Sequence, residues 1–404
     1  MSWDKVKIGD CCEITSSKRI FFSEYVECGV PFYRSKEIIE SSNGQEISEP
    51  LFISQEKYDE IKKNFGVPQP DDMLLTSVGT IGVPYIVKED DYFYFKDGNL
   101  TWFRKFNNKL TSKYLYYWVR SAEGQGVLNN TTIGSSQKAL TIASLKGLEI
   151  PCPPVDVQGR IVEILYSYDA LIENNQKQIK LLEEAAQRLY KEWFVDLRFP
   201  GHETTPIIDG IPEGWVRYKF SEIASIMSGG TPKTDVKEYY DGNIPFYTPK
   251  DSDGSFFAFD TITHISKFGL DHCNSQYYPA GTVIITARGT VGKTTILAMP
   301  MAMNQSCYAL KCDDLNSPYY LFFSLNKEVA ALKTMANGGV FNTIIVKTFD
   351  SIHLTVPTEE VLTAFDAMVS PMMEQIKAKM QQQVMLAEAR GRLLPKLMNG
   401  EIEV

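Results

Sequence analysis

Apolar residues recur at alternating intervals of four and three along two segments of the chain, which is the heptad spacing of helices that pack together. The first segment follows the Pro-Cys-Pro-Pro run at 151–154, where a strand can end and a helix begin. Its seam positions are Ile161, Leu165, Tyr168, Ile172, Asn175, Ile179, Leu182, Ala186, Leu189 and Trp193. Those of the second segment are Phe365, Val369, Met372, Ile376, Lys379, Gln383, Leu386, Arg390 and Leu393. We therefore predict two long helices that pair.

Each predicted helix has a polar residue near the middle of its seam, Asn175 in the first and Lys379 in the second. A polar seam residue sets register and partner choice at some cost in stability. Pro371 is expected to kink or restart the second helix, because proline lacks the backbone N–H. The alternative is that each helix packs only on its own globular domain.

The rest of the chain has short β-type apolar runs separated by Gly, Pro, Asn and Ser. Such runs lie at 73–78, 92–95, 283–287 and 343–346. This pattern is typical of α/β or α+β globular domains with irregular element order.

The two halves of the chain repeat one another, block by block and in the same order. The pattern that begins at Trp3 returns at Trp215, and the Pro-Phe-Tyr block that ends at Tyr33 returns at Tyr247. Thr-Ser-Val-Gly-Thr-Ile-Gly at 76–82 matches Thr-Ala-Arg-Gly-Thr-Val-Gly at 286–292. The helical segments match at a constant offset of 204 residues. We predict two tandem copies: a globular domain at 1–153, a spacer helix at 154–198, a second globular domain at 199–356 and a second spacer helix at 357–404.

Composition and charge narrow the class of protein. The chain has 404 residues, of which 44% are hydrophobic and 23% charged, and these values are ordinary for globular proteins. It lacks a membrane-length apolar stretch and the apolar core of a signal peptide, so we expect a cytoplasmic protein. The net charge is −9, and each of the four predicted segments is acidic, which argues against a DNA-binding protein that acts alone.

Three kinds of chemistry are disfavoured. The seven cysteines and four histidines are scattered without metal-ligand spacing, so no metal site is expected. Residues 287–294 resemble a loose phosphate-binding loop, but a proline soon follows and the matching position in the first copy has no lysine. Asn243-Ile-Pro-Phe246 departs from the Asn-Pro-Pro-Phe signature of amino-methyltransferases. We expect no catalytic residues.

The duplicated order of these features resembles the specificity subunit of type I restriction-modification systems. In each copy a Trp-led start, a Pro-Phe-Tyr block, a Gly-Thr-[Ile/Val]-Gly loop, an Asn-Leu or Asn-Gln strand and a long helix follow one another. The first helix ends with Leu-Tyr-Lys-Glu-Trp-Phe at 189–194, and the second with Leu-Leu-Pro-Lys-Leu-Met-Asn-Gly at 393–400. The resemblance covers essentially the whole chain, although the helix starts at 157–159 and 358–360 are weaker than is usual for the family.

The resemblance implies that each globular domain is a target recognition domain for one half of a split, double-stranded DNA sequence. The two helices would pair antiparallel as a spacer and dock two modification (methyltransferase) subunits, through which restriction subunits would join. Methyl donor, ATP and Mg²⁺ would belong to those partners, and this chain would need no cofactor and perform no bond chemistry.

The glycine loops and their neighbours are the predicted base-reading surfaces. Glycine allows close approach of backbone to a ligand, and Arg or Lys can pair with guanine edges. The candidates are Arg34, Lys36, Ser77, Thr80, Gln137 and Lys138 in the first copy, and Thr248, Lys250, Arg288, Thr290, Lys293 and Asn342 in the second. The alternative is that these glycines only form tight hairpins and that the cations are solvated.

A second function class is a non-catalytic scaffold whose coiled coil joins two protein-binding domains. The net negative charge favours it, and the repeated polar loops disfavour it. The sequence gives neither the DNA target nor the residues that read each base.

Overall fold

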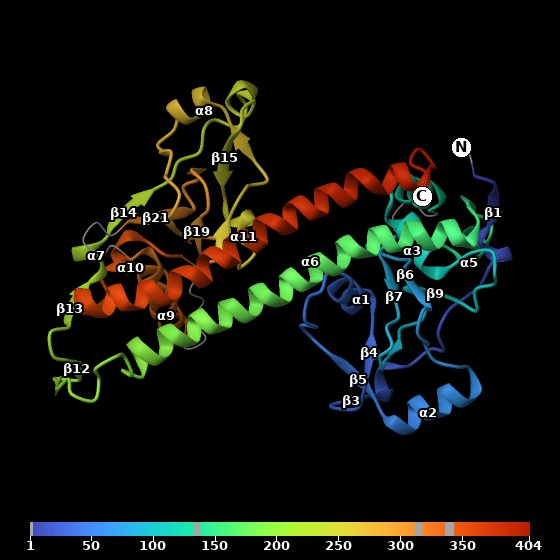
Figure 1. Cartoon of the computed structure of the whole chain (residues 1–404), viewed down its shortest axis with the longest axis horizontal. Helices are drawn as coiled ribbons and strands as arrows, with labels where there is room; N and C mark the ends of the chain where they lie inside the picture. The colour runs from blue at the N-terminus through green and yellow to red at the C-terminus, as the bar shows by residue number, and fades with distance from the viewer. Residues whose placement is uncertain (1–2, 133–137, 312–316, 336–342) are drawn as a thin grey trace. The chain divides into compact units, whose positions relative to one another are not determined.

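The chain forms two compact units, each with its own globular domain and a stretch of both long helices. The computed structural model describes residues 3–132, 138–311, 317–335 and 343–404 (Figure 1). Unit 1 comprises residues 1–174 and 383–404, and unit 2 comprises residues 175–382. Within the described residues, no helix is both long and apolar enough to cross a bilayer.

The described residues of unit 1 form two four-stranded sheets and one small two-stranded sheet. The strands are β1 (Lys5–Lys7), β2 (Glu13–Thr15), β3 (Tyr25–Val26), β4 (Val30–Tyr33), β5 (Leu51–Ile53), β6 (Met73–Thr76), β7 (Pro84–Ile86), β8 (Tyr94–Phe95), β9 (Leu100–Arg104) and β10 (Glu149–Pro151). The sheets have the orders β2-β9-β6-β7, β3-β5-β4-β8 and β1-β10. All pairs are antiparallel except β4 with β8, which is parallel.

Short helices cover the sheets of unit 1. They are η1 (Ile8–Asp10), η2 (Phe22–Glu24), α1 (Ser35–Ser42), α2 (Gln55–Asn64), α3 (Ser112–Arg120), α4 (Ala122–Thr131) and α5 (Ile142–Lys146). All four residues of β6 are buried, which explains why Met73, Leu74 and Leu75 follow one another without alternating with polar residues.

Unit 2 repeats this plan with some additions. Its strands are β11 (Ile207–Ile208), β12 (Ile211–Pro212), β13 (Val216–Lys219), β14 (Ser225–Ser228), β15 (Ile244–Tyr247), β16 (Phe257–Ala258), β17 (His264–Ile265), β18 (Val283–Thr286), β19 (Thr294–Leu297), β20 (Ala302–Met303), β21 (Cys307–Lys311) and β22 (His353–Val356). Its short helices are α7 (Phe220–Ile223), η4 (Lys237–Tyr239), η5 (Pro249–Asp251), α8 (Lys267–Asp271), α9 (Pro318–Met335) and α10 (Val346–Phe349).

The strand pairing confirms the two tandem copies. The sheet β14-β21-β18-β19-β16 corresponds to β2-β9-β6-β7 with one strand added. The antiparallel pair β13 and β22 corresponds to β1 and β10, and the parallel pair β15 and β20 corresponds to β4 and β8. Each pair of strands is parallel or antiparallel in both units alike, and the strands follow the same order along the chain. The repeat seen in the sequence is therefore a repeat of topology.

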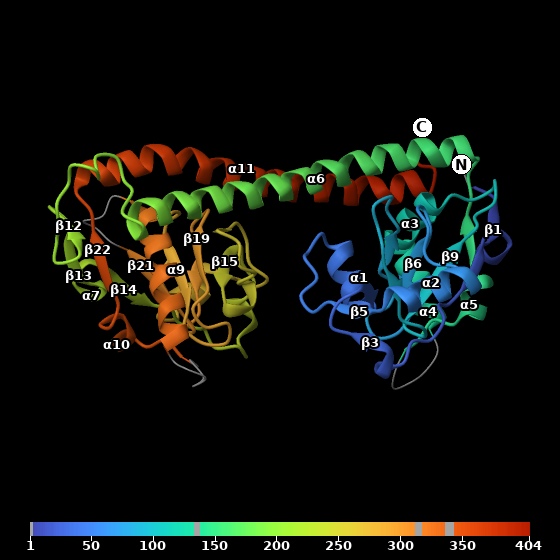
Figure 2. The same cartoon turned by 90° about the horizontal axis from the view of Figure 1, so that it is seen from below.

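The two long helices are α6 (Val155–Tyr190), which continues into the π-helical turn η3 (Lys191–Val195), and α11 (Glu359–Met398). In each unit a stretch of α6 lies beside a stretch of α11 (Figure 1 and Figure 2). In unit 1, Ile161 and Leu165 share a buried cluster with Leu394 and Leu397. In unit 2, Asn175 Nδ2 donates to Gln382 Oε1 at 3.0 Å, so the polar seam residue of α6 has a partner on α11.

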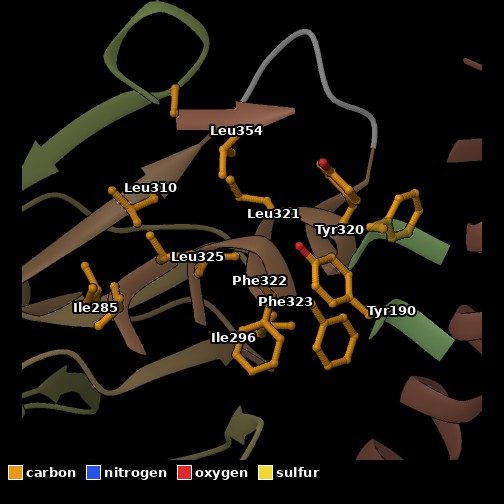
Figure 3. Close-up of a cluster of buried hydrophobic side chains, with 14 of the residues drawn as sticks. Tyr190, Ile285, Ile296, Leu310, Tyr320, Leu321, Phe322, Phe323, Leu325 and Leu354 are labelled. Atoms are coloured by element: carbon orange, nitrogen blue, oxygen red, sulfur yellow. The ribbon is translucent and has the colours of Figure 1, made fainter. Parts of the chain in front are cut away.

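The seam positions also pack on the globular domains, so both predicted modes of helix packing occur together. In unit 2, Tyr190 at the end of α6 points toward Tyr320 and Phe323 of α9 (Figure 3). The Tyr190 hydroxyl shares a 3.1 Å hydrogen bond with Ser324 Oγ. These residues belong to one core with Phe365 and other residues of α11.

Two local predictions are wrong. The run at 343–346 is not a strand: residues 343–345 are irregular and α10 begins at Val346. Helix α11 is continuous through Pro371, so the predicted restart there is wrong, whereas a kink at Pro371 stays a prediction. The bounds of the four predicted segments stay a prediction, since the compact units divide the chain within both helices.

Candidate nucleic-acid interface

The repeated glycine motif forms the same hairpin in both units. It lies at 77–82 between β6 and β7, and at 287–292 between β18 and β19. Gly79 and Gly82 have φ of 81° and 82°, and Gly289 and Gly292 have φ of 78° and 72°. This left-handed backbone favours glycine, which explains why both glycines of the motif recur at the same spacing.

A threonine at the start of each hairpin fixes its shape. Thr76 Oγ1 accepts from the backbone N–H of Val83 at 2.9 Å, and Thr286 Oγ1 accepts from that of Lys293 at 3.1 Å. The N–H of Gly82 also donates to the Thr76 carbonyl at 2.9 Å. The glycines therefore do form tight hairpins, and these hairpins hold the residues at their tips in a fixed geometry.

The carbonyl of the last glycine in each hairpin is held by a side chain from a neighbouring helix. In unit 1, Gln125 Nε2 of α4 donates to the Gly82 carbonyl at 2.8 Å. In unit 2, Lys333 Nζ of α9 donates to the Gly292 carbonyl at 3.3 Å. An amide and an ammonium group thus make the same contact in the two copies.

The structure brings Lys138 to the hairpin of unit 1. Ala139 pairs with Val78 in an antiparallel bridge, and the Leu140 N–H donates to the Ser77 carbonyl at 2.9 Å. The Ile344 N–H makes the matching 2.9 Å bond to the Ala287 carbonyl in unit 2. The segment at 343–345 therefore borders the hairpin although it is not a strand.

In unit 2 the segment that contains Thr248 and Lys250 contacts the hairpin directly. Thr290 Oγ1 donates to the Pro249 carbonyl at 3.2 Å, and Lys293 Nζ donates to the Ser252 carbonyl at 3.3 Å. These contacts bring five candidate residues of the second copy into one cluster: Thr248, Lys250, Arg288, Thr290 and Lys293. Lys333, which was not a candidate, lies beside them through its bond to the Gly292 carbonyl.

In unit 1 the two cations after β4 have carboxylate partners. Arg34 Nη2 pairs with Glu37 Oε1 at 2.5 Å, and the Glu37 side chain is buried. Hydrogen bonding to Glu37 raises the pKa of Arg34 above its ordinary value, despite some desolvation. Lys36 Nζ pairs with Glu49 Oε2 at 2.9 Å.

The candidate residues differ in exposure. Ser77 is buried and bonded to Thr101 Oγ1 at 2.7 Å, so its hydroxyl is not available to a ligand in this conformation. Thr248 is half-buried and donates to Asp251 Oδ2 at 2.7 Å. Gln137 and Asn342 lie outside the described residues. The exposed candidates are Lys36, Thr80, Lys138, Lys250, Arg288, Thr290 and Lys293.

Sequence reasoning missed Gln125 and Lys333. Both lie in helices about 40 residues after the loops they contact, and neither belongs to a repeated motif. Only the matching glycine carbonyls reveal that the two side chains are equivalent. The phosphate-binding-loop reading of 287–294 is excluded by the fold, because strand β19 rather than a helix follows the loop.

Known proteins with the same organisation are type I restriction specificity subunits. The sequence profile described as "Type I restriction modification DNA specificity domain" matches residues 1–184 and 212–382. The MjaIX specificity subunit of Methanocaldococcus jannaschii is 24% identical over 422 residues, covering 100% of this chain and 94% of that protein. The HindI specificity subunit of Haemophilus influenzae is 25% identical over 325 residues, covering 65% of this chain and 71% of that protein.

The fold also matches a solved structure. The crystal structure of the type I restriction-modification S subunit from M. genitalium has a TM-score of 0.62 and 15% identity, and covers 98% of this chain and 96% of that chain. Two tandem specificity domains, each with the same glycine-hinged hairpin, fit recognition of a target in two parts. The chain belongs to the type I restriction-modification DNA specificity family.

Proposed function

We propose that this chain selects the DNA sequence on which a type I restriction-modification complex acts, and that each unit reads one half of a two-part target. The observation that supports this most is the duplicated hairpin, which presents different side chains at the same positions of the two units. A pair of similar readers suits a target in two halves, as two-fold DNA-binding proteins suit palindromic operators.

The paired helices are the proposed docking surface for two modification subunits. Several large apolar side chains of α6 and α11 are exposed, and a partner that docks on the helices could bury them. In unit 1 these are Tyr166, Leu171, Val384 and Met385, and in unit 2 they are Leu181 and Met368. Restriction subunits would join through the modification subunits.

The net charge of −9 suits a subunit that shares its DNA contacts. Phosphate contacts supply most of the affinity for DNA, whereas contacts to base edges supply the specificity. We propose that the modification subunits hold much of the DNA backbone, leaving base reading to this chain. Methyl donor, ATP and Mg²⁺ would then be bound by the partners, in the cytoplasm where the DNA lies.

Reconstitution tests this function. The purified chain, its modification subunit and the two together are each incubated with DNA and a labelled methyl donor. We expect sequence-specific methylation only when both proteins are present. Methylation by this chain alone, or the same methylation pattern by the modification subunit without it, would contradict the proposal. A scaffold would join the partner without changing which sequences are methylated.

A further inference from the structure

The cations at the two hairpins differ in whether a carboxylate neutralises them. In the described part of unit 2, Lys250, Arg288, Lys293 and Lys333 form no ion pair. The corresponding positions of unit 1 are Lys36, which pairs with Glu49, and three uncharged residues, Val78, Val83 and Gln125. At these four matched positions, unit 2 therefore has four cations without a carboxylate partner and unit 1 has one paired cation, although the exposed Lys138 also borders the unit 1 hairpin.

Two of these cations lie near one another at the hairpin of unit 2. The Lys333 ammonium bonds to the Gly292 carbonyl, and the Lys293 ammonium bonds to the Ser252 carbonyl. Burial and repulsion from Lys293 both lower the pKa of Lys333. Two ammonium groups that repel each other, with only neutral carbonyls as described partners, favour a bound anion between or beside them.

The position of Lys333 is fixed by close packing. A Cβ atom on Gly292 would lie 2.6 Å from Val329 Cγ1 and 3.0 Å from Lys333 Nζ, so the glycine allows α9 to approach the hairpin. The Lys333 ammonium is thus held against the backbone of the loop that also contains Arg288. A charge fixed next to a base-reading loop, rather than at its tip, suits a phosphate of the DNA strand that the loop approaches.

We propose that Lys333 binds a DNA backbone phosphate and thereby positions the unit 2 hairpin on its half-site. Unit 1 lacks this contact, because Gln125 provides the same hydrogen bond without the charge. The inference rests on the proposed DNA-recognition function and adds to it a difference between the two halves: the half-site bound by unit 2 is held more strongly by phosphate contacts.

The first copy supplies the natural test variant. Lys333→Gln replaces lysine by the residue that makes the same carbonyl contact in unit 1, so the hairpin keeps its support and loses only the charge. Lys333→Arg keeps the charge. Lys327→Gln is the matched control, because Lys327 lies on the same helix but pairs with Glu328 at 3.2 Å.

The measurement is the affinity of the assembled complex with its modification subunits for its DNA target, as a function of salt concentration. Each phosphate contact contributes about 0.9 to the slope of log K against log salt concentration. We expect Lys333→Gln to lower the slope by about 1 and to weaken binding roughly five- to tenfold at about 0.1 M salt, with an unchanged methylated sequence. Lys333→Arg and Lys327→Gln should keep the wild-type slope.

An unchanged slope for Lys333→Gln, or an equal loss of slope in Lys327→Gln, would overturn the inference. A changed methylated sequence in Lys333→Gln would also overturn it, because the residue would then read a base. A different result would contradict the proposed function itself: the wild-type complex would bind no sequence more tightly than unrelated DNA.

Discussion

Arg288 is the residue at which the two hairpins differ most in what they can offer to DNA. It is exposed and forms no hydrogen bond or ion pair with another described residue, whereas Val78 occupies the matching position in unit 1. A guanidinium held at a fixed hairpin tip can make two bonds to a guanine, and such a pair contributes about 1–3 kcal/mol of discrimination.

We therefore expect Arg288→Ala to relax the sequence requirement at one position of one half-site, while the other half is read as before. Sequencing of methylated sites in cells that contain the variant complex would measure this. Full retention of both sequence specificity and affinity would show that Arg288 is not a reader.

Glu183 of α6 is a carboxyl whose protonation is coupled to the packing of unit 2. Burial raises its pKa to about 7, and a hydrogen bond from the backbone of Phe256 offsets part of that effect. Because the folded-state pKa lies above the unfolded value, this group stabilises unit 2 least at high pH, and stability is lost as pH rises from about 4.5 through 7.

Replacing Glu183 by Gln should remove this pH dependence. A pKa shift is equivalent to about 1.4 kcal/mol of unfolding free energy per unit, so the shift at Glu183 contributes at most about 3 kcal/mol. The actual contribution should be smaller, because the side chain is partly exposed and solvent screens its charge. The difference in unfolding free energy between Glu183→Gln and wild type should grow from pH 4.5 to 8. A constant difference across this range, or an equal trend in the exposed neighbour Glu184→Gln, would refute the assignment.

At the element scale, two turns that flank β18 need glycine for different reasons: Gly281 lies in the turn before this strand, and Gly292 lies in the hairpin after it. Gly281 and Gly292 both have positive φ, 85° and 72°, but a Cβ would meet open space at Gly281 and Val329 Cγ1 at Gly292. Gly281→Ala therefore measures backbone strain alone, whereas Gly292→Ala adds a clash with α9.

We expect Gly292→Ala to destabilise the protein by about 1–3 kcal/mol more than Gly281→Ala, as measured by chemical denaturation. Equal losses in the two variants would mean that α9 does not press on the hairpin, which would also weaken the argument for Lys333.

The seam of the long helices allows a second test at this scale. Ile172 and Leu182 are half-buried positions of α6, one in each unit. Replacing both by Asp would place uncompensated charges in the seam, at a cost of roughly 1–3 kcal/mol or more for each. We expect loss of solubility or of assembly with the modification subunit in co-purification. The exposed pair Lys177→Asp and Arg188→Asp is the control, and unchanged assembly of the seam variant would show that the seam is not an interface.

The sequence predicted some elements well and others poorly, for physical reasons. The heptad spacing predicted α6 and α11 because helix packing needs only a periodic apolar face. The run at 343–346 has the apolar residues of a strand but is not one: Ile344 is buried in the apolar core of unit 2, and its N–H bonds to the Ala287 carbonyl outside any sheet. Comparison of the copies indicates Arg288 as a candidate reader, which stays a prediction, but it cannot indicate Lys333, whose contact with Gly292 depends on tertiary packing.

For the whole molecule, duplication and acidity have a common explanation. The two copies keep one topology while the charges at their hairpins differ, as expected if the framework is needed twice and the DNA surfaces must read different sequences. We expect a net charge of −9 to limit DNA binding by the chain alone, so that recognition would depend on assembly with partners.

Methylome sequencing tests directly whether this chain selects the methylated sequence and whether each unit reads one half of it. A strain that expresses this chain with its modification subunit is compared with strains that lack the chain or contain Arg288→Ala in unit 2. We expect one two-part methylated motif in the strain with the wild-type chain. The motif should be absent in the strain that lacks the chain, and only one of its halves should change in the Arg288→Ala strain. A motif that persists without the chain, or a variant that alters both halves together, would contradict it.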